Sequence, residues 1–172
     1  MKRSPLLARA LAIAILIIAL DQASKAWIVL AVMTPPRVIE VTSFFNLVLT
    51  WNRGVSFGMF NHGDPLPSWV LPLIALAIVA FLLGWLFRAD RLPLAYGLGA
   101  IVGGAIGNLI DRLRVGAVVD FLDMHVAGYH WPAFNIADSA ITLGVVVLIV
   151  DSLTGPSTGR ERRSGLGRET RE

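Results

Sequence analysis

Cysteine is absent from this chain of 172 residues. Its absence excludes disulfide bonds, thiolate metal sites, cysteine nucleophiles and lipid attachment to a cysteine of this chain. Charged residues are also scarce, at 16% of the sequence, whereas hydrophobic residues make up 55% and the mean hydropathy is +0.68. Soluble domains of this size carry more charge and fewer apolar residues. The composition therefore predicts one membrane domain.

Several well-known signatures of function are missing as well. The sequence contains no P-loop and no dinucleotide fingerprint, and its apolar segments hold no serine and histidine pair with an acid to orient it. The formal net charge of +3 and the pI near 10.0 raise the question of nucleic-acid binding. The basic residues, however, lie at the termini and in short connections, which is typical of a membrane topology signal. No nucleic-acid partner is expected.

Four apolar segments have about the length that a helix needs to cross a bilayer. The first follows Lys2 and Arg3 and resembles the start of a cleaved signal peptide, but its apolar character continues to Met33, which favours a retained helix. Four spans put both termini on one side, and the excess of arginine and lysine there predicts that this side is cytoplasmic. The segments cover residues 6–33, 69–87, 94–110 and 137–153.

Two regions outside these spans differ in composition. Residues 38–52 are rich in valine, isoleucine, threonine and phenylalanine, and they predict a small sheet or hairpin at the membrane surface, closed by turns at Gly54 and Gly58. Residues 155–172 contain almost nothing apolar, so we expect a disordered basic tail on the cytoplasmic side and a single folded domain over residues 1–154. Four aromatic residues suit an interfacial belt: Trp51, Phe57, Phe60 and Trp69.

Glycines recur at every fourth position of the third span, at Gly99, Gly103 and Gly107. Residues with this spacing lie on one face of a helix. Small residues there let a neighbouring helix approach closely, so the pattern predicts helix packing rather than chemistry.

Two aspartates frame the connection between the third and fourth spans. Asp120 follows the third span in VVDF, and Asp138 stands at the start of the fourth in FNIAD. Because the intervening segment, which we expect to be a loop, leaves and returns on the same membrane face, the two carboxylates can meet. Two carboxylates at close range do not both ionise readily, so one keeps a proton while the other accepts one from water. This is the electronic arrangement of an aspartic protease.

The positions of these aspartates predict that the two differ in how readily they ionise. Asn135 fits the N-cap of the fourth span, which puts Asp138 at the third helical position, near the positive end of the helix dipole. We hypothesise that Asp138 is the more readily ionised member and Asp120 the more often protonated one, although titration belongs to the pair. The alternative is that both are loop and cap residues, the commoner role of a single aspartate beside a helix start.

Asp111 and Arg112 lie where the third span is expected to end, with Asn108 one turn earlier. Adjacent residues cannot point the same way on a helix. Asp111 is therefore either a third candidate for the acidic pair or a structural partner for a group on another helix. We favour the structural role, because an arginine readily satisfies an acid at a helix end.

Further polar residues leave alternatives open. Asp21 and Lys25 are spaced i, i+4 in the first span, and they either neutralise each other or orient the acidic site from a neighbouring helix. Asn52 is either a hydrogen-bonding group at the rim of the site or an ordinary turn residue before Gly54. A metal site is not expected, because the acidic and histidine residues near position 125 show no recognisable ligand spacing: Asp123, His125 and His130.

Five motifs occur in the order typical of one family of bacterial membrane proteins. They read DQASK at 21–25, NRGVSFG at 52–58, GGAIGNLIDR at 103–112, VVDF at 118–121 and FNIAD at 134–138. With these motifs in register over almost the whole chain, the sequence resembles the lipoprotein signal peptidase family, the type II signal peptidases.

This resemblance implies a mainly α membrane aspartyl endopeptidase with four transmembrane helices and a small extracytoplasmic β cradle. It implies an enzyme of the bacterial cytoplasmic (inner) membrane, in contact with membrane lipids, with its site near the extracytoplasmic face and with no cofactor. The substrates would be prolipoproteins, cleaved immediately before a cysteine that carries a diacylglyceryl group, and globomycin-type peptides would block the site. By motif match the catalytic pair is Asp120 and Asp138. The positions that would bind substrate or support the site are Asp21, Lys25, Asn52, Gly54, Asn108, Asp111, Arg112 and Asn135.

Two other classes of function remain as rivals. A small transporter or ion pathway would also place aspartate, lysine and asparagine in membrane segments, but it predicts acids spread through the membrane depth and a repeat between halves. Here the acids gather at one face and no repeat is evident. A non-catalytic lipid-binding or assembly protein would tolerate amide replacements at Asp120 and Asp138.

Overall fold

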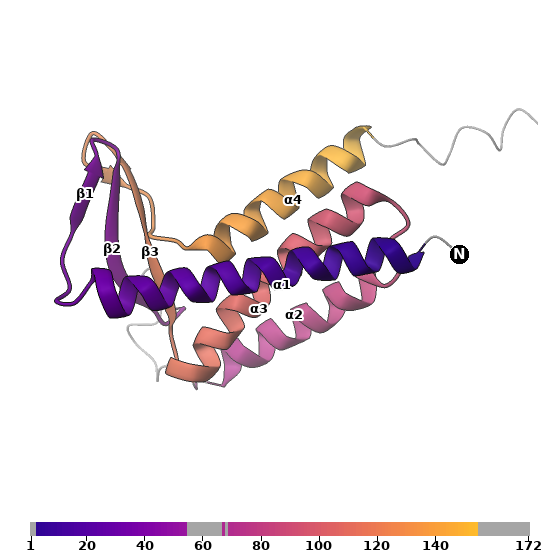
Figure 1. Ribbon diagram of the computed structural model, residues 1–172, viewed down its shortest axis with the longest axis horizontal. Helices are drawn as coiled ribbons and strands as arrows, with labels where there is room; N and C mark the ends of the chain where they lie inside the picture. Colours follow the sequence, from indigo (N-terminus) through magenta and orange to yellow (C-terminus); the bar gives the residue numbers. More distant parts are fainter. Residues whose placement is uncertain (1–2, 55–66, 68, 155–172) are drawn as a thin grey trace, which may run out of the picture.

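In the part of the chain that the computed structural model describes, four helices lie side by side, with an antiparallel sheet at one end of the bundle (Figure 1). The structure describes residues 3–54, 67 and 69–154. The predicted tail, the turn at Gly58 and the aromatic residues Phe57 and Phe60 lie outside these residues. The helices are α1 (Arg3–Trp27), which continues as the π-helical turn η1 (Ile28–Val32), α2 (Val70–Leu86), α3 (Leu92–Val115) and α4 (Ile136–Thr154).

Three of these helical segments are long and apolar enough to cross a membrane: Pro5–Val32, Leu92–Val115 and Ile136–Thr154. α2 is also apolar but has 17 residues, the short end of the range for a span. The third span was predicted to end at Ile110, and this is wrong, because α3 continues to Val115. It stops at Gly116, whose φ of 72° is left-handed and whose N–H donates to the Arg112 carbonyl.

α3 is the central helix, and its glycines let the neighbouring helices come close. A side chain at Gly99 or Gly103 would collide with the backbone of α1, at Ala10 and Ala14 respectively. At Gly104 it would collide with the carbonyl of Ala137 on α4. The predicted packing role of the glycine stripe is therefore confirmed. These close approaches hold α1 and α4 against α3.

The sheet has four strands in the order β1-β2-β3-β4, all antiparallel. β1 (Ile39–Thr42) and β2 (Phe45–Asn52) form the hairpin predicted from composition. The connection between α3 and α4 was expected to be a loop, and this is wrong, because it forms β3 (Val118–Val126) and β4 (Tyr129–His130). β3 pairs along β2, so the strand depends on a partner far away in the sequence.

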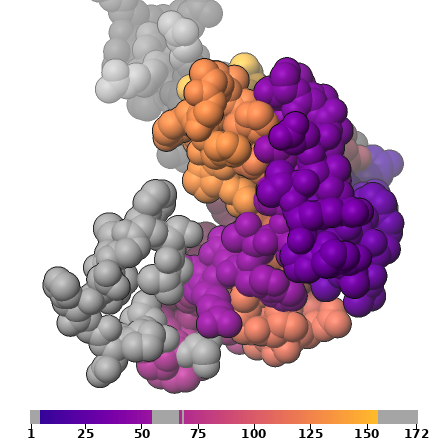
Figure 2. Space-filling model, turned by 90° about the vertical axis from the view of Figure 1, so that its left-hand side faces the viewer, coloured from indigo at the N-terminus to yellow at the C-terminus, as the bar shows by residue number. Residues whose placement is uncertain are grey.

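The sheet end and the chain ends lie at opposite ends of the bundle. The first and last described residues, Arg3 and Thr154, lie away from the sheet (Figure 1). Figure 2 looks at the sheet end and shows the segment from β3 to the start of α4 (orange) beside β1, β2 and the end of α1 (indigo to purple). The polar side chains of the candidate site gather near this end.

Candidate active site

Asp120 lies in β3 and is almost completely buried, with 1% of its surface exposed. Both of its carboxylate oxygens accept hydrogen bonds from amide side chains. Asn52 Nδ2 on β2 donates to Oδ2 at 2.9 Å, and Asn135 Nδ2 donates to Oδ1 at 2.7 Å. Pairing of β2 with β3 brings Asn52 to this carboxylate. The carboxylate is thus held at a defined position.

Asp138 is positioned by the cap of α4. Asn135 Oδ1 accepts a hydrogen bond from the Asp138 N–H at 2.9 Å, and the Asn135 N–H donates to Asp138 Oδ2 at 3.2 Å. This reciprocal pair is a capping box, with Asp138 at the third helical position as predicted. The other oxygen, Oδ1, accepts from Asn108 Nδ2 on α3 at 2.8 Å. Asn135 therefore contacts both carboxylates and links them.

Lys25 contacts Asn108, the residue that donates to Asp138, and it is buried, with 3% of its surface exposed. Its Nζ donates to Asn108 Oδ1 at 2.9 Å, so the Asn108 amide is turned with its NH₂ group toward Asp138. The same Nζ lies 2.8 Å from Asp21 Oδ2 and 2.8 Å from Asp111 Oδ2. All three donors of the ammonium group are used. Because a carboxylate flanks it on each side, the buried charge of Lys25 is neutralised.

Asp21 contacts both Lys25 and the start of α4. Asp21 pairs with Lys25, and its Oδ1 also accepts the N–H of Ala137 in the first turn of α4 at 3.0 Å. Asp21 thus ties α1 to the helix start that carries Asp138. The two carboxylates on either side of Lys25 are bridged by Gln22, whose Nε2 lies 3.2 Å from Asp21 Oδ2 and 2.9 Å from Asp111 Oδ1. Gln22 was missed as a supporting residue, although it lies in the DQASK motif.

Asp111 pairs with a group on another helix, as its structural interpretation required. The expectation that an arginine would satisfy it is wrong, since its partner is Lys25 on α1. Asp111 also accepts the Val119 N–H at 3.2 Å and so fixes the start of β3 beside α3. Arg112 Nη1 donates to the Asn108 carbonyl of its own helix at 3.4 Å, and within the described residues Arg112 forms no ion pair with Asp120 or Asp138.

Asn52 combines the two roles that its sequence position left open. Its Oδ1 accepts the Gly54 N–H at 2.8 Å, which forms a turn, while its Nδ2 donates to Asp120. Gly54 has a φ of 78°, a left-handed conformation that favours glycine, and a side chain there would collide with Leu71 on α2. The turn therefore orients the amide that holds Asp120.

The surroundings of Asp120 change its acidity. Burial is the main cause that raises the pKa of this carboxyl, the hydrogen bond from Asn52 opposes the rise, and the negative charge of Asp138 adds to it. The resulting pKa is about 6. Near pH 6 the Asp120 carboxyl can therefore both hold and release a proton, and the predicted division of labour between Asp120 and Asp138 stays a prediction.

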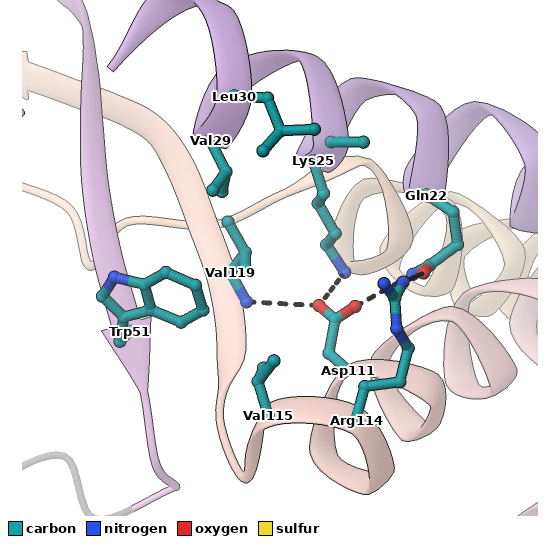
Figure 3. A pocket seen from close by; sticks show the side chains of 10 residues that line it. Gln22, Lys25, Val29, Leu30, Trp51, Asp111, Arg114, Val115 and Val119 are labelled. Carbon is teal, nitrogen blue, oxygen red and sulfur yellow. Dashed lines mark hydrogen bonds and ion pairs between the residues drawn. The ribbon is translucent and has the colours of Figure 1, made fainter. Parts of the chain in front are cut away.

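A cavity of about 160 Å³ lies on the α1 side of the strands (Figure 3). Its wall includes Trp51 on β2 and Val119 on β3, which are paired in the sheet. Neighbouring residues of a strand point to opposite faces, so Val119 lies on the face opposite to that of Asp120. Lys25 and Asp111 point toward each other between Val119 and Gln22 (Figure 3). The cavity therefore borders the supporting network and not the face of the sheet that carries Asp120.

A second polar cluster lies toward the C-terminal end of β3, and the hydrogen bonds described for it do not involve Asp120 or Asp138. His130 Nδ1 lies 2.9 Å from the Asp123 carboxylate, and Asn46 Nδ2 donates to the same group at 3.0 Å. Burial opposes ionisation of Asp123, but these hydrogen bonds outweigh it and hold its pKa below the usual range. Over the described part of the chain, histidine and acidic residues form no group arranged to hold a metal ion.

Apolar helices with two linked carboxylates at one end define a class of protein: a membrane protein equipped for the acid–base chemistry of aspartic peptidases. A sequence model of the family described as signal peptidase (SPase) II matches residues 13–154. The chain therefore belongs to the signal peptidase II family, whose members are aspartic peptidases.

Similar proteins agree with this family. A lipoprotein signal peptidase of Rhodopseudomonas palustris (strain TIE-1) is 49% identical over 148 residues, which cover 83% of this chain and 90% of the relative. One from Methylorubrum extorquens (strain PA1) is 48% identical over 139 residues, with 79% and 80% covered.

Solved structures are also similar. A bacterial membrane enzyme determined by the in meso method at 2.3 Å resolution has 31% sequence identity and a TM-score of 0.75, with 90% of this chain and 93% of the other covered. A second structure of a bacterial membrane enzyme, at 1.9 Å resolution, has 30% identity and a TM-score of 0.74. These likenesses extend over helices and sheet alike, so the fold is that of a membrane enzyme.

Proposed function

We propose that Asp120 and Asp138 are the catalytic pair with which this chain removes signal peptides from lipoprotein precursors. The observation that carries the proposal is the position of Asn135, which is completely buried and holds one carboxylate through its side chain and the other through its backbone N–H. Family membership supports the reaction and its aspartic mechanism. The hydrogen bonds support the assignment of residues.

The two carboxylates divide the work in this proposal. Asp138 takes a proton from a water molecule, and the resulting hydroxide attacks the carbonyl carbon of the scissile peptide bond. Asp120 keeps its proton at first, because its pKa is raised to about 6, and donates a hydrogen bond to the carbonyl oxygen. After the two exchange roles, a proton reaches the leaving amine. No cofactor enters this sequence of steps.

The supporting residues keep the pair in place. Asn52, positioned by Gly54, and Asn135 hold Asp120, while Asn108 holds Asp138. Lys25 fixes Asn108, and Asp21 and Asp111 neutralise Lys25. Arg112 is proposed only as a residue near the rim, since it does not contact the carboxylates among the described residues.

The proposed topology has four spans, α1 to α4, in the bacterial inner membrane. Both termini lie in the cytoplasm, and the sheet forms a cradle at the extracytoplasmic face. The position of the sheet opposite the chain ends supports this arrangement (Figure 1), and so does the enrichment of basic residues at the chain ends. Residues 1–154 form one domain, followed by a basic cytoplasmic tail.

The substrate chemistry follows from this topology. Water reaches carboxylates at the outer ends of the helices, while acyl chains of a substrate remain in lipid. We propose that the chain cleaves immediately before a cysteine that carries a diacylglyceryl group. Membrane lipids surround the helices, and globomycin-type peptides compete for the same site.

The decisive experiment compares three isosteric variants of the purified protein on a prolipoprotein with a diacylglyceryl cysteine. Asp120→Asn and Asp138→Asn are expected to reduce release of the signal peptide by a factor on the order of 10³, because each removes one proton-transfer group. Asp90→Asn is the matched control, since Asp90 is exposed at the opposite end of the bundle.

Folding is monitored in parallel by size exclusion and thermal unfolding. Full activity of a folded Asp120→Asn or Asp138→Asn variant would show that the pair is misassigned, and Asp111 would be the next carboxylate to test. A folded wild type that cleaves no prolipoprotein would contradict the proposed reaction itself.

A further inference from the structure

The outer surface of α2 carries a groove of about 440 Å³, far from the acidic pair. We name it the α2 groove, and it is lined by Ala80, Phe81, Gly84, Trp85 and Arg88. Its volume lies in the range of small-molecule sites. The groove takes no part in the mechanism proposed above.

The shape of the α2 groove suits a linear apolar chain. Ala80 and Gly84 are four residues apart and form a floor of small residues, and a Cβ added at Gly84 would meet no atom within 4 Å. Phe81 and Trp85 form one wall, with their ring centroids 6.4 Å apart. From Ala80 to Arg88 the groove runs for about 12 Å at 1.5 Å per residue, roughly the length of ten methylene groups.

A cation lies at the end of this apolar groove. Arg88 follows α2 in a turn, where its N–H donates to the Trp85 carbonyl. Within the described residues, Arg88 forms no salt bridge, whereas the nearby Arg91 pairs with Asp151 at 3.1 Å. Arginine binds phosphate readily and remains charged at every physiological pH. The groove therefore offers apolar contact along its floor and a positive charge at its mouth.

We propose that the α2 groove binds one acidic phospholipid of the bilayer, with an acyl chain along Ala80 and Gly84 and the phosphate on Arg88. The proposal rests on the four-span topology above but not on the catalytic pair. A partner helix is the other occupant that small residues favour. A helix would leave the Arg88 charge uncompensated, whereas a phosphate neutralises it.

Such a lipid compensates for the shortness of α2. With 17 residues α2 is about 25 Å long, less than the hydrocarbon core of about 30 Å. A short span is accommodated by local thinning of the bilayer or by extended flanking side chains. A phospholipid bound to Arg88 fixes the depth of this end of α2 in the membrane.

The test measures lipid retention by the purified full-length protein. The protein is equilibrated with micelles that contain equal amounts of phosphatidylglycerol and phosphatidylcholine, and the retained lipids are counted by native mass spectrometry. We expect phosphatidylglycerol to be preferred about fivefold, with a preference that falls as NaCl is added. Arg88→Gln should abolish the preference, and Gly84→Leu, which fills the groove, should abolish retention.

Matched variants separate this site from general effects. Arg9→Gln removes an exposed cation at the same end of the bundle, and Ala12→Leu enlarges an exposed residue of α1; both should retain lipid as the wild type does. Equal retention of the two lipids by wild type, or identical behaviour of Arg88→Gln and Arg9→Gln, would overturn the proposal. So would a dimer that Gly84→Leu dissociates, because it would identify a partner helix. Prolipoprotein cleavage by the same samples reports separately on the catalytic pair.

Discussion

Asp120 shows how the surroundings of a single residue define its chemistry. The same side chain in water would be ionised at neutral pH, with a pKa near 3.9. In β3 it is buried and faces the charge of Asp138, and its pKa rises to about 6. Two amide groups nevertheless keep the ionised form accessible. Burial thus raises the pKa of Asp120, and the two amide hydrogen bonds lower it.

The raised pKa predicts the pH dependence of cleavage. The proposed mechanism requires one protonated and one ionised carboxylate, so kcat/KM should rise as the pair first ionises and fall as Asp120 loses its proton above about pH 6. In Asn52→Ala the hydrogen bond that lowers this pKa is lost, so the alkaline limb should move to higher pH. A kcat/KM profile between pH 4 and 9 measures both effects.

Asn46→Ala provides the control for this profile. Asn46 lies on the same strand as Asn52 and donates to Asp123 instead of Asp120. Its removal should leave the alkaline limb in place. An alkaline limb that is unchanged in Asn52→Ala would contradict the role of Asp120 as the proton holder.

Lys25 is predicted to be essential for stability as well as for the geometry of the site. Lys25→Met leaves Asp21 and Asp111 buried without their shared cation, which should cost about 3–5 kcal/mol in the free energy of unfolding. Arg91→Met removes the cation of a partly exposed pair, in which 43% of the Arg91 side chain and 11% of the Asp151 side chain are exposed, and should cost only about 1 kcal/mol. Thermal unfolding in detergent compares the two variants. Equal melting temperatures would show that the buried cluster adds no stability.

At the scale of helices and strands, local patterns were more predictable than distant contacts. Three of the four predicted spans follow from hydropathy, and the capping box follows from Asn135 and Asp138, which lie three positions apart. β3 could not be recognised in the same way, since its strand depends on pairing with β2. The partner of Asp111 and the bridging role of Gln22 also depend on how α1 packs against α3. Neighbours brought together by packing leave no periodic signal in the sequence.

Close packing of α3 against α4 gives a prediction for the helical bundle. Gly104→Ala would place a methyl group against the Ala137 carbonyl and push the first turn of α4 away from α3. We expect a loss of about 1–3 kcal/mol in unfolding free energy and reduced cleavage, since that turn carries Asp138. Thermal unfolding and prolipoprotein cleavage are the two measurements.

Gly84→Ala is the matched control, because a methyl group there meets no atom within 4 Å. It should be neutral or slightly stabilising, since alanine is the better helix former. If Gly104→Ala unfolds at the same temperature as Gly84→Ala, the helices are not held as closely as this packing requires.

For the whole molecule, the proposed membrane orientation predicts which introduced cysteines can be labelled from outside the cell. A cysteine introduced at Tyr129, in the exposed hairpin of β3 and β4, should react with an impermeant maleimide in spheroplasts. A cysteine at Asp90, between α2 and α3, should react only after permeabilisation. Because the natural chain contains no cysteine, the wild type is an unlabelled control. Labelling of both variants in sealed spheroplasts would contradict the proposed orientation.

The hydrogen bond between Asp21 and the Ala137 N–H joins the first helix of the chain to the last. During translation Asp21 leaves the ribosome long before its partner exists, and Asp120 is made before the helix that carries Asp138. A nascent chain that ends before Asp138 cannot contain both carboxylates. With Asp120 and Asp138 as the proposed catalytic pair, the site is therefore completed only after the start of α4 has been made, and a chain synthesised only as far as β3 is expected to cut none of the precursors that share its membrane.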